Sequence, residues 1–272
     1  MSSDSAPESR RTPAPNAQAP ATDGDVTLDI ATGIATLTFS HPKGNSLPAS
    51  LLAALTTEIE ALGADYRARV IVLRSVGTGS FCAGASFDEL KRIDNAESGT
   101  EFFMGFARLI LAMRRSPKMI VSRVHGKVVG GGVGIVAASD YAIAVPEASV
   151  RLSEVAVGIG PFVVGPVIEH RIGRAAFGAM GIDAEWRDAD WALRHGLYAR
   201  LCDNVLALDQ VISTFAHKLA SFNPDALQAL KAALNEGTDH WETLLPERAA
   251  MSGRLVTSEF TRQAIAAFER RA

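Results

Sequence analysis

Three short apolar runs separated by helix-like segments constrain the fold of this chain more than any other feature. Residues 70–73 (VIVL), 119–124 (MIVSRV) and 141–145 (YAIAV) are apolar along most of their length, as strands buried on both faces are. The segments between them repeat apolar residues at helical spacing. Strands that alternate with helices predict an α/β fold with a largely parallel sheet covered by helices.

The remainder of the chain falls into three predicted parts. Residues 1–24 are mainly Ser, Pro, Ala, Asp and Gln, a composition that predicts a disordered N-terminal tail. Residues 25–200 hold the α/β core, and residues 201–272 show helical spacing without a strand pattern. We expect the helices of this last part at about 206–222, 224–235, 241–252 and 256–270.

The core begins with a predicted β-hairpin over residues 26–39, whose turn is Ala31–Thr32–Gly33. A helix follows it. Ser46 is the expected cap of that helix, and Pro48 is tolerated in its first turn because the missing N–H would be unpaired there.

Charge and composition exclude several classes of protein. The chain has 27 Lys+Arg and 30 Asp+Glu, a formal net charge of −3. It therefore lacks the excess of positive charge that favours binding to nucleic acid or to an anionic membrane. No apolar run approaches the roughly 18 residues of a membrane-spanning helix. Cys82 and Cys202 form no metal-binding pattern, and the N-terminus lacks a secretory signal. We expect a cytoplasmic protein with no metal, no nucleic-acid partner and no membrane association.

Small residues gather in three segments that follow predicted strands: 80–87 (SFCAGASF), 129–134 (VGGGVG) and 151–155 (RLSEV). Open α/β sheets bind ligands at such strand ends. Glycine lets the backbone approach a ligand, and the first N–H groups of a helix are unpaired. One N–H from each glycine-rich segment would form an oxyanion hole for a carbonyl oxygen. Each segment alone is more often an ordinary tight turn.

In this order and spacing the three segments resemble those of the crotonase (enoyl-CoA hydratase/isomerase) superfamily, from about Val26 to the C-terminus. The resemblance implies an α/β, crotonase-like (ClpP/crotonase) ββα superhelix core with a helical C-terminal trimerisation region. It also implies a homotrimer or homohexamer. The substrate would be an acyl-CoA, with coenzyme A as part of the substrate and no other cofactor.

The resemblance also assigns roles to individual residues. The last alanine of an FCAGAD-like segment, here Ala85, and the middle glycine of the triplet, here Gly131, supply the two N–H groups. The glutamate of a PE-like pair, here Glu154, moves a proton at the acyl chain, and its apolar neighbours would raise its pKa towards working pH. Further residues are expected to bind substrate: Ala83, Phe87, Gly132, Gly134, Phe162 and Phe268.

Gly134 is the most informative departure from the family pattern, because hydratases of the family usually carry a second glutamate there. The space beside a glycine would hold a water or a branched or carboxylated acyl group, or it would be closed by a helix that packs nearer. A water would otherwise be oriented by backbone groups or by a side chain such as Asp88, Glu89 or His125. Phe162 and Val163 either line and narrow the acyl pocket or are ordinary core residues.

Three residues beside these segments have simpler interpretations. Cys82 is expected to be a small buried residue of a tight turn, since no base is paired with it. His125 is expected to be a strand-end histidine with backbone partners. Ser86 stands where the family often has Asp, which leaves the Ala85 N–H untouched.

Three functions stay open on the sequence. The usual activity of the family narrowly favours hydration, with a branched substrate such as 3-methylglutaconyl-CoA, whereas the missing second carboxylate favours delta3-delta2 enoyl-CoA isomerisation by Glu154 alone. A non-catalytic acyl-CoA binder is the third, and the intact Ala85, Gly131 and Glu154 argue against it. We therefore expect an enzyme, either an enoyl-CoA hydratase (a lyase) or an enoyl-CoA isomerase.

Overall fold

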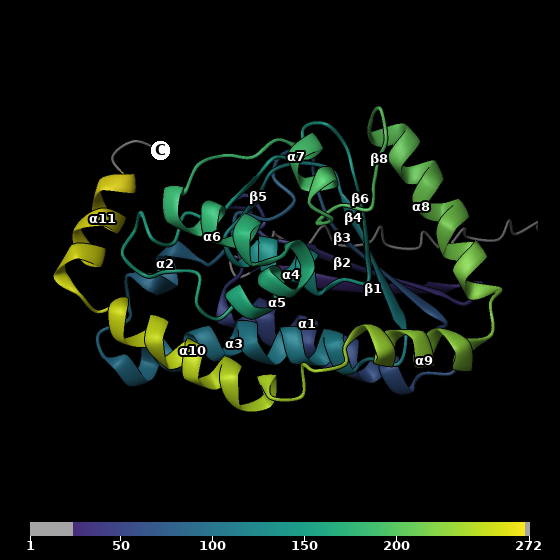
Figure 1. The fold of residues 1–272 in the computed structure, drawn as a ribbon, viewed down its shortest axis with the longest axis horizontal. Helices are drawn as coiled ribbons and strands as arrows, with labels where there is room; N and C mark the ends of the chain where they lie inside the picture. The colour runs from purple at the N-terminus through teal and green to yellow at the C-terminus, as the bar shows by residue number, and fades with distance from the viewer. Residues whose placement is uncertain (1–23, 270–272) are drawn as a thin grey trace, which may run out of the picture.

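The computed structural model describes residues 24–269, with side chains as far as Ala267. A six-stranded sheet runs through the molecule in the order β1-β2-β3-β4-β6-β8, and helices cover it (Figure 1). β1 and β2 form the predicted antiparallel hairpin, and every other neighbouring pair is parallel. The predicted α/β class with a largely parallel sheet is therefore confirmed. The tail predicted for residues 1–24 lies, except for Gly24, outside the described residues.

The elements follow one another in the alternation expected from the sequence. The strands are β1 (Asp25–Ala31), β2 (Ile34–Ser40), β3 (Val70–Ser75), β4 (Met119–Val124), β5 (Val128–Val129), β6 (Tyr141–Ala144), β7 (Val150–Arg151) and β8 (Arg200–Leu201). The helices are α1 (Ala49–Ala64), α2 (Phe87–Leu90), α3 (Ala96–Arg115), α4 (Gly131–Ala138), α5 (Gly165–Ile172), α6 (Arg174–Asp183), α7 (Ala189–Arg194), α8 (Val205–Ala220), α9 (Pro224–Leu234), α10 (Trp241–Leu255) and α11 (Glu259–Glu269). The helices expected after residue 200 correspond to α8–α11.

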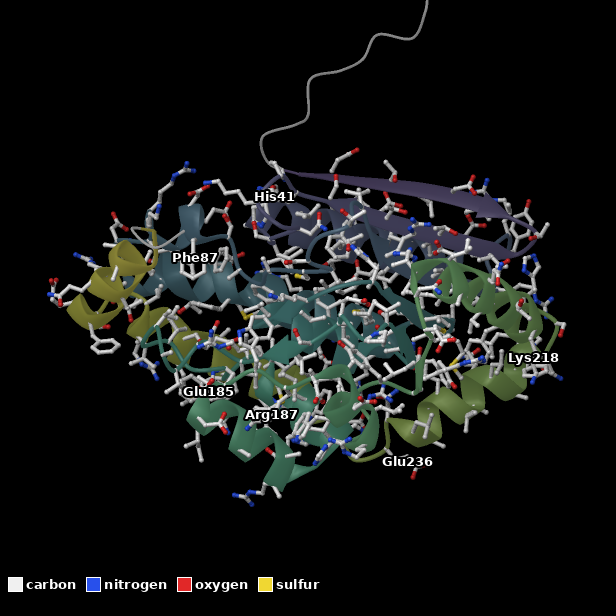
Figure 2. All side chains as sticks on the ribbon, turned by 90° about the horizontal axis from the view of Figure 1, so that it is seen from above. His41, Phe87, Glu185, Arg187, Lys218 and Glu236 are labelled. Atoms are coloured by element: carbon white, nitrogen blue, oxygen red, sulfur yellow. The ribbon has the colours of Figure 1, made fainter. Side chains whose placement is uncertain are left out.

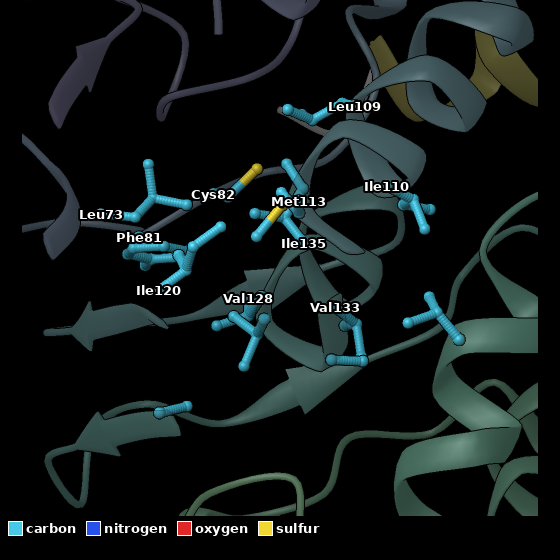
Figure 3. Close-up of a cluster of buried hydrophobic side chains, with 14 of the residues drawn as sticks. Leu73, Phe81, Cys82, Leu109, Ile110, Met113, Ile120, Val128, Val133 and Ile135 are labelled. Carbon is cyan, nitrogen blue, oxygen red and sulfur yellow. The ribbon is translucent and has the colours of Figure 1, made fainter. Parts of the chain in front are cut away.

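The core lies between the sheet and the helices that pack on it. Figure 3 shows part of it, where side chains of β3 and β4 meet those of α3 and α4. Burying one large apolar side chain of this kind stabilises the fold by about 1.5–3 kcal/mol. α10 runs along α3, and the two come close because a Cβ on Gly99 would lie only 2.6 Å from the carbonyl oxygen of Gly253. None of the helices in the described range has the length and apolarity needed to cross a membrane.

α1 begins differently from the sequence prediction. Pro48 is its N-cap, and the Ser46 hydroxyl instead lies 2.8 Å from Nδ1 of His41. Pro48 itself is extended, with φ −69° and ψ 163°, so the helix starts only after it. The Ala49 N–H donates to Oε2 of Glu89 at 2.7 Å. A carboxylate from α2 therefore caps α1 across the fold.

An ion pair fixes α8 to the sheet. Arg123 of β4 is buried and donates through Nε to Oδ1 of Asp209 on α8 at 2.5 Å. This bond lowers the pKa of Asp209. Because a buried guanidinium is costly without a partner, the pair stabilises this helix–sheet packing only while both members are present.

Replacing Asp209 with Ala tests the anchor. The Asp209 side chain is 46% exposed, so water screens part of the interaction, and we expect the free energy of unfolding to fall by about 1–3 kcal/mol. Urea denaturation measures this loss. Asp203→Ala, at an exposed residue just before α8, is the control and should change the free energy of unfolding by less than about 0.5 kcal/mol. Equal losses in both variants would contradict the anchoring role.

Candidate active site

Three short segments of extended backbone run side by side beneath the site. Cys82 pairs with Val128, and β5 pairs with β7, in parallel in both cases. The Val129 N–H donates to the Cys82 carbonyl oxygen, and the Gly130 N–H donates to the Arg151 carbonyl oxygen, both at 2.9 Å. Because the three segments run in the same direction, their carboxyl ends meet at one edge.

The three predicted site segments begin at this edge. Ala83–Gly84–Ala85 follows Cys82, Gly130–Gly131 follows β5, and Leu152–Ser153–Glu154 follows β7. Gly84 has φ +86°, and a Cβ there would lie 2.9 Å from the Val129 carbonyl oxygen. Only glycine permits so close an approach in that conformation.

The backbone N–H groups of Ala85 and Gly131, both at this edge, have no acceptor among the described residues. Leu47 forms a parallel bridge with Ala85, but its hydrogen bonds go to Gly84 and Ser86, so the Ala85 N–H takes no part. Gly131 is the first residue of α4 and has no intrahelical acceptor. Ala85 and Gly131 both line one cavity.

This cavity has a volume of about 50 Å³ and is mostly apolar. Glu154 is the one titratable side chain that lines it within the described part of the chain. Phe87 of α2, labelled in Figure 2, also lines it. The remaining lining side chains come from the segment after Cys82, from α2, α3 and β5, and from the segment after β7: Ala83, Ala85, Leu90, Phe103, Phe106, Val129, Ser153, Val157, Ile159, Pro161, Val163 and Val164.

Burial dominates the surroundings of the Glu154 carboxyl. Its Oε2 is buried and has no hydrogen-bond partner in the described range, although the residue as a whole is only half-buried. Burial raises the pKa of Glu154 to about 7. Hydrogen bonds from the backbone N–H groups of Glu154 and Ser153 lower this pKa, but by less. A carboxyl that titrates near neutral pH can both accept and return a proton.

The structure brings Ala83, Phe87, Ala85, Gly131 and Glu154 to the cavity, as the sequence predicted. The predicted substrate-binding role of Phe268 lies outside the described side chains.

Gly132 and Gly134 do not line this cavity, contrary to the sequence prediction. A Cβ on Gly132 would lie 2.7 Å from Cβ of Cys82, so this glycine lets α4 close against the first segment. A Cβ on Gly134 would lie 2.5 Å from Cγ1 of Val164. Of the alternatives that the sequence left open, a closer contact therefore fills the space beside Gly134.

Phe162 lies on the other side of the wall from Glu154. Its ring folds over Gly160, which has φ +80°, and lines a separate groove of about 550 Å³ bordered by α5, α6 and α10. Pro161 lines both hollows. The predicted role of Phe162 in narrowing the acyl pocket is not supported, because its neighbours Val163 and Val164 face the cavity instead.

The side chains suggested for orienting a water lie elsewhere. Asp88 forms an ion pair with Lys43 at 2.5 Å, and Glu89 caps α1. His125 is buried, and neither ring nitrogen has a partner among the described atoms, so the expected backbone bonds are absent. Burial and the charges of Arg123 and Arg74 lower the pKa of His125 to about 4.

Cys82 and Ser86 have structural roles. Cys82 is buried, as predicted, and burial raises its pKa to about 12. Ser86 is the N-cap of α2 and accepts a hydrogen bond from the Glu89 N–H at 3.4 Å.

Sequence reasoning missed most of the apolar wall, in particular Phe103, Phe106 and Val164. The two phenylalanines fit the buried face of α3, and nothing in their spacing separates a cavity wall from a core position. Val164 precedes α5 and meets the active site only through tertiary packing.

Comparison with known proteins defines the class. The family model "Enoyl-CoA hydratase/isomerase" matches residues 29–271, and the chain belongs to this family. It is 32% identical to (E)-benzylidenesuccinyl-CoA hydratase of Thauera aromatica, over 79% of this chain and 83% of that protein. It is 30% identical to mitochondrial enoyl-CoA delta isomerase 1 of Homo sapiens, over 77% and 70%. The crystal structure of an enoyl-CoA hydratase from Mycobacterium avium superposes with a TM-score of 0.80 at 27% identity, covering 92% of this chain and 97% of that one. The crotonase-like fold and the enzyme class predicted from the sequence are thus confirmed.

The raised pKa of Glu154 predicts a stability that depends on pH. Between about pH 4.5 and 7 the folded state keeps a proton that the unfolded state loses, so the free energy of unfolding falls as pH rises through this window. Glu154→Gln removes the buried charge and should raise the free energy of unfolding at pH 8 by about 1–3 kcal/mol, with little gain near pH 4.5. Urea denaturation at both pH values measures the difference. Glu147→Gln, at an exposed residue, is the control and should not raise the free energy of unfolding at either pH. If Glu147→Gln raised the free energy of unfolding at pH 8 as much as Glu154→Gln does, burial would be ruled out as the cause.

Proposed function

We propose that this enzyme moves a carbon–carbon double bond in an enoyl-CoA thioester, from the 3-enoyl to the conjugated 2-enoyl position. The observation that carries the proposal is that Glu154 is the one titratable side chain, among the described residues, in a mostly apolar cavity that Ala85 and Gly131 also line. One carboxyl suffices for this reaction because the proton removed from one carbon is returned to another.

The chemistry follows from the positions of these groups. The N–H groups of Ala85 and Gly131 hold the thioester carbonyl oxygen, and the Glu154 carboxylate takes a proton from C2. The electron pair of the broken C–H bond forms a double bond between C1 and C2, and negative charge collects on the carbonyl oxygen. Each N–H donor in such a site is worth roughly 2.7–4 kcal/mol of transition-state stabilisation. Glu154 then gives the proton to C4, which leaves the double bond between C2 and C3.

Hydration is the second candidate. The relative from Thauera aromatica is named a hydratase, and Ser153, the residue before the proposed base, lines the cavity and carries a hydroxyl group that can bind water. Hydration was also the activity that the sequence narrowly favoured. In that reaction the oxygen of water bonds to C3 and a proton is added at C2.

A spectroscopic assay tests the proposal. The purified protein is mixed with a 3-enoyl-CoA, a 2-enoyl-CoA and 3-methylglutaconyl-CoA, and the ultraviolet band of the conjugated enoyl thioester is followed. We expect the band to appear from the 3-enoyl substrate, with kcat/KM rising through about pH 7 as Glu154 ionises. Glu154→Gln should lower turnover by at least about 100-fold while the Kd for substrate changes little. Loss of the band from a conjugated substrate, with none gained from the 3-enoyl substrate, would replace isomerisation with hydration.

Binding of substrate without turnover of any of the three thioesters would instead favour a non-catalytic acyl-CoA binder. The acyl group that the enzyme prefers is the one with the highest kcat/KM in this panel.

A cytoplasmic location also stays a prediction.

We infer that the chain assembles as a trimer or a pair of trimers, as the family resemblance implies. Large apolar side chains are exposed on the C-terminal helices, among them Leu206 of α8 and Leu230 and Leu234 of α9. Exposed apolar surface of this kind favours contact with another chain. Sedimentation equilibrium should give three or six times the 28.8 kDa of the chain. A monomer at micromolar concentration would contradict this inference.

A further inference from the structure

Val164 fills the space beside Gly134. It is 2% exposed, lines the Glu154 cavity, and packs against the Cα of Gly134, where a Cβ would lie 2.5 Å from Cγ1 of Val164 and 2.7 Å from its Cβ. The room made by the missing side chain of Gly134 is thus occupied by the Cβ and Cγ1 atoms of Val164, from another part of the chain.

Water is the molecule that this packing keeps out. A buried water needs roughly 10–15 Å³ of space and two to four polar partners. The polar groups are already present, since Oε2 of Glu154 has no partner among the described residues and Ser153 also lines the cavity. Space beside Gly134 is the missing requirement, because Cγ1 of Val164 lies only 2.5 Å from where a Cβ on Gly134 would be.

Exclusion of water matters for the product of the proposed reaction. A conjugated thioester whose carbonyl is polarised by two N–H groups is electrophilic at C3. A water in the cavity would bond through its oxygen to C3 as its proton passes to Glu154, and Glu154 would return that proton to C2. Isomerisation and hydration therefore use the same groups and differ in whether a water is present.

We propose that Val164 is the residue that selects between these reactions, by excluding water from the reacting carbons. The inference rests on the proposed function, because it takes isomerisation as the activity of the native enzyme. Val164 acts through its volume, and Gly134 is the position that allows it to come so close.

Two substitutions at Val164 separate volume from polarity. Val164→Ala removes two methyl groups and opens space beside Gly134. Val164→Thr keeps the shape and adds a hydroxyl that can hold a water. Val163→Ala is the matched control, because Val163 is also buried and lines the cavity but is absent from the contacts of Gly134.

The measurement is the ratio of hydration to isomerisation. Each variant is given a 3-enoyl-CoA and a 2-enoyl-CoA, and mass spectrometry detects product heavier by one water. We expect this ratio to rise at least about tenfold in Val164→Ala, to rise in Val164→Thr, and to stay within about twofold of the native value in Val163→Ala. Thermal unfolding confirms that each variant is folded.

The outcomes separate the two proposals. If the native enzyme isomerises and neither Val164 variant gains hydration relative to Val163→Ala, the role of Val164 is wrong and the proposed function stands. If the native enzyme fails to isomerise any 3-enoyl thioester, the proposed function is wrong. Rapid hydration by a native enzyme that also isomerises overturns the role of Val164 alone, because water then already reaches C3 past Val164.

Discussion

The parallel backbone pairing of Cys82, β5 and β7 is the constraint on which the site depends. It places three chain segments, distant in sequence, so that all end at one edge, and each contributes a different group there. Ala85 and Gly131 contribute backbone N–H groups, and Glu154 contributes the carboxyl. Since backbone atoms form the pairing, the positions of the two donors depend on the fold and on the glycines that allow close approach.

Two ion pairs with buried cations hold elements together, whereas the carboxyl of Glu154 lines the cavity. Arg123 and Asp209 join α8 to β4, and Lys231 of α9 donates to Asp140 at 2.8 Å beside the sheet. These buried cations have acidic partners, which offsets the cost of their burial. Glu154 has no partner on Oε2 among the described residues, and burial raises its pKa to about 7. The buried carboxyl costs stability at neutral pH, and the same burial gives it a pKa suited to the acid–base role proposed for it.

Local patterns predicted most of the fold, because apolar periodicity and turn residues act over a few residues. The hairpin, β3, β4, β6 and the C-terminal helices all follow from such patterns. The site segments were found because small residues follow strands, and the family resemblance gave their roles. The start of α1, the unpartnered His125 and the position of Phe162 were not predicted, since each is decided by contacts between residues far apart in the chain. Glu89 capping Ala49 across the fold is one such contact.

The glycines of α4 show why the reaction type was harder to predict than the site. A glycine in a sequence suggests empty space, but in a close-packed protein that space belongs to a neighbour. Phe106 packs on Gly131, Cys82 on Gly132 and Val164 on Gly134. The first two contacts hold the Gly131 N–H at the cavity, and the third fixes what else can enter it. By the role proposed for it, Val164 thus limits which reactions Glu154 can catalyse. Val164 lies 30 positions along the chain from Gly134, the glycine that lets it come so close. The identity of residue 134 alone does not reveal this effect.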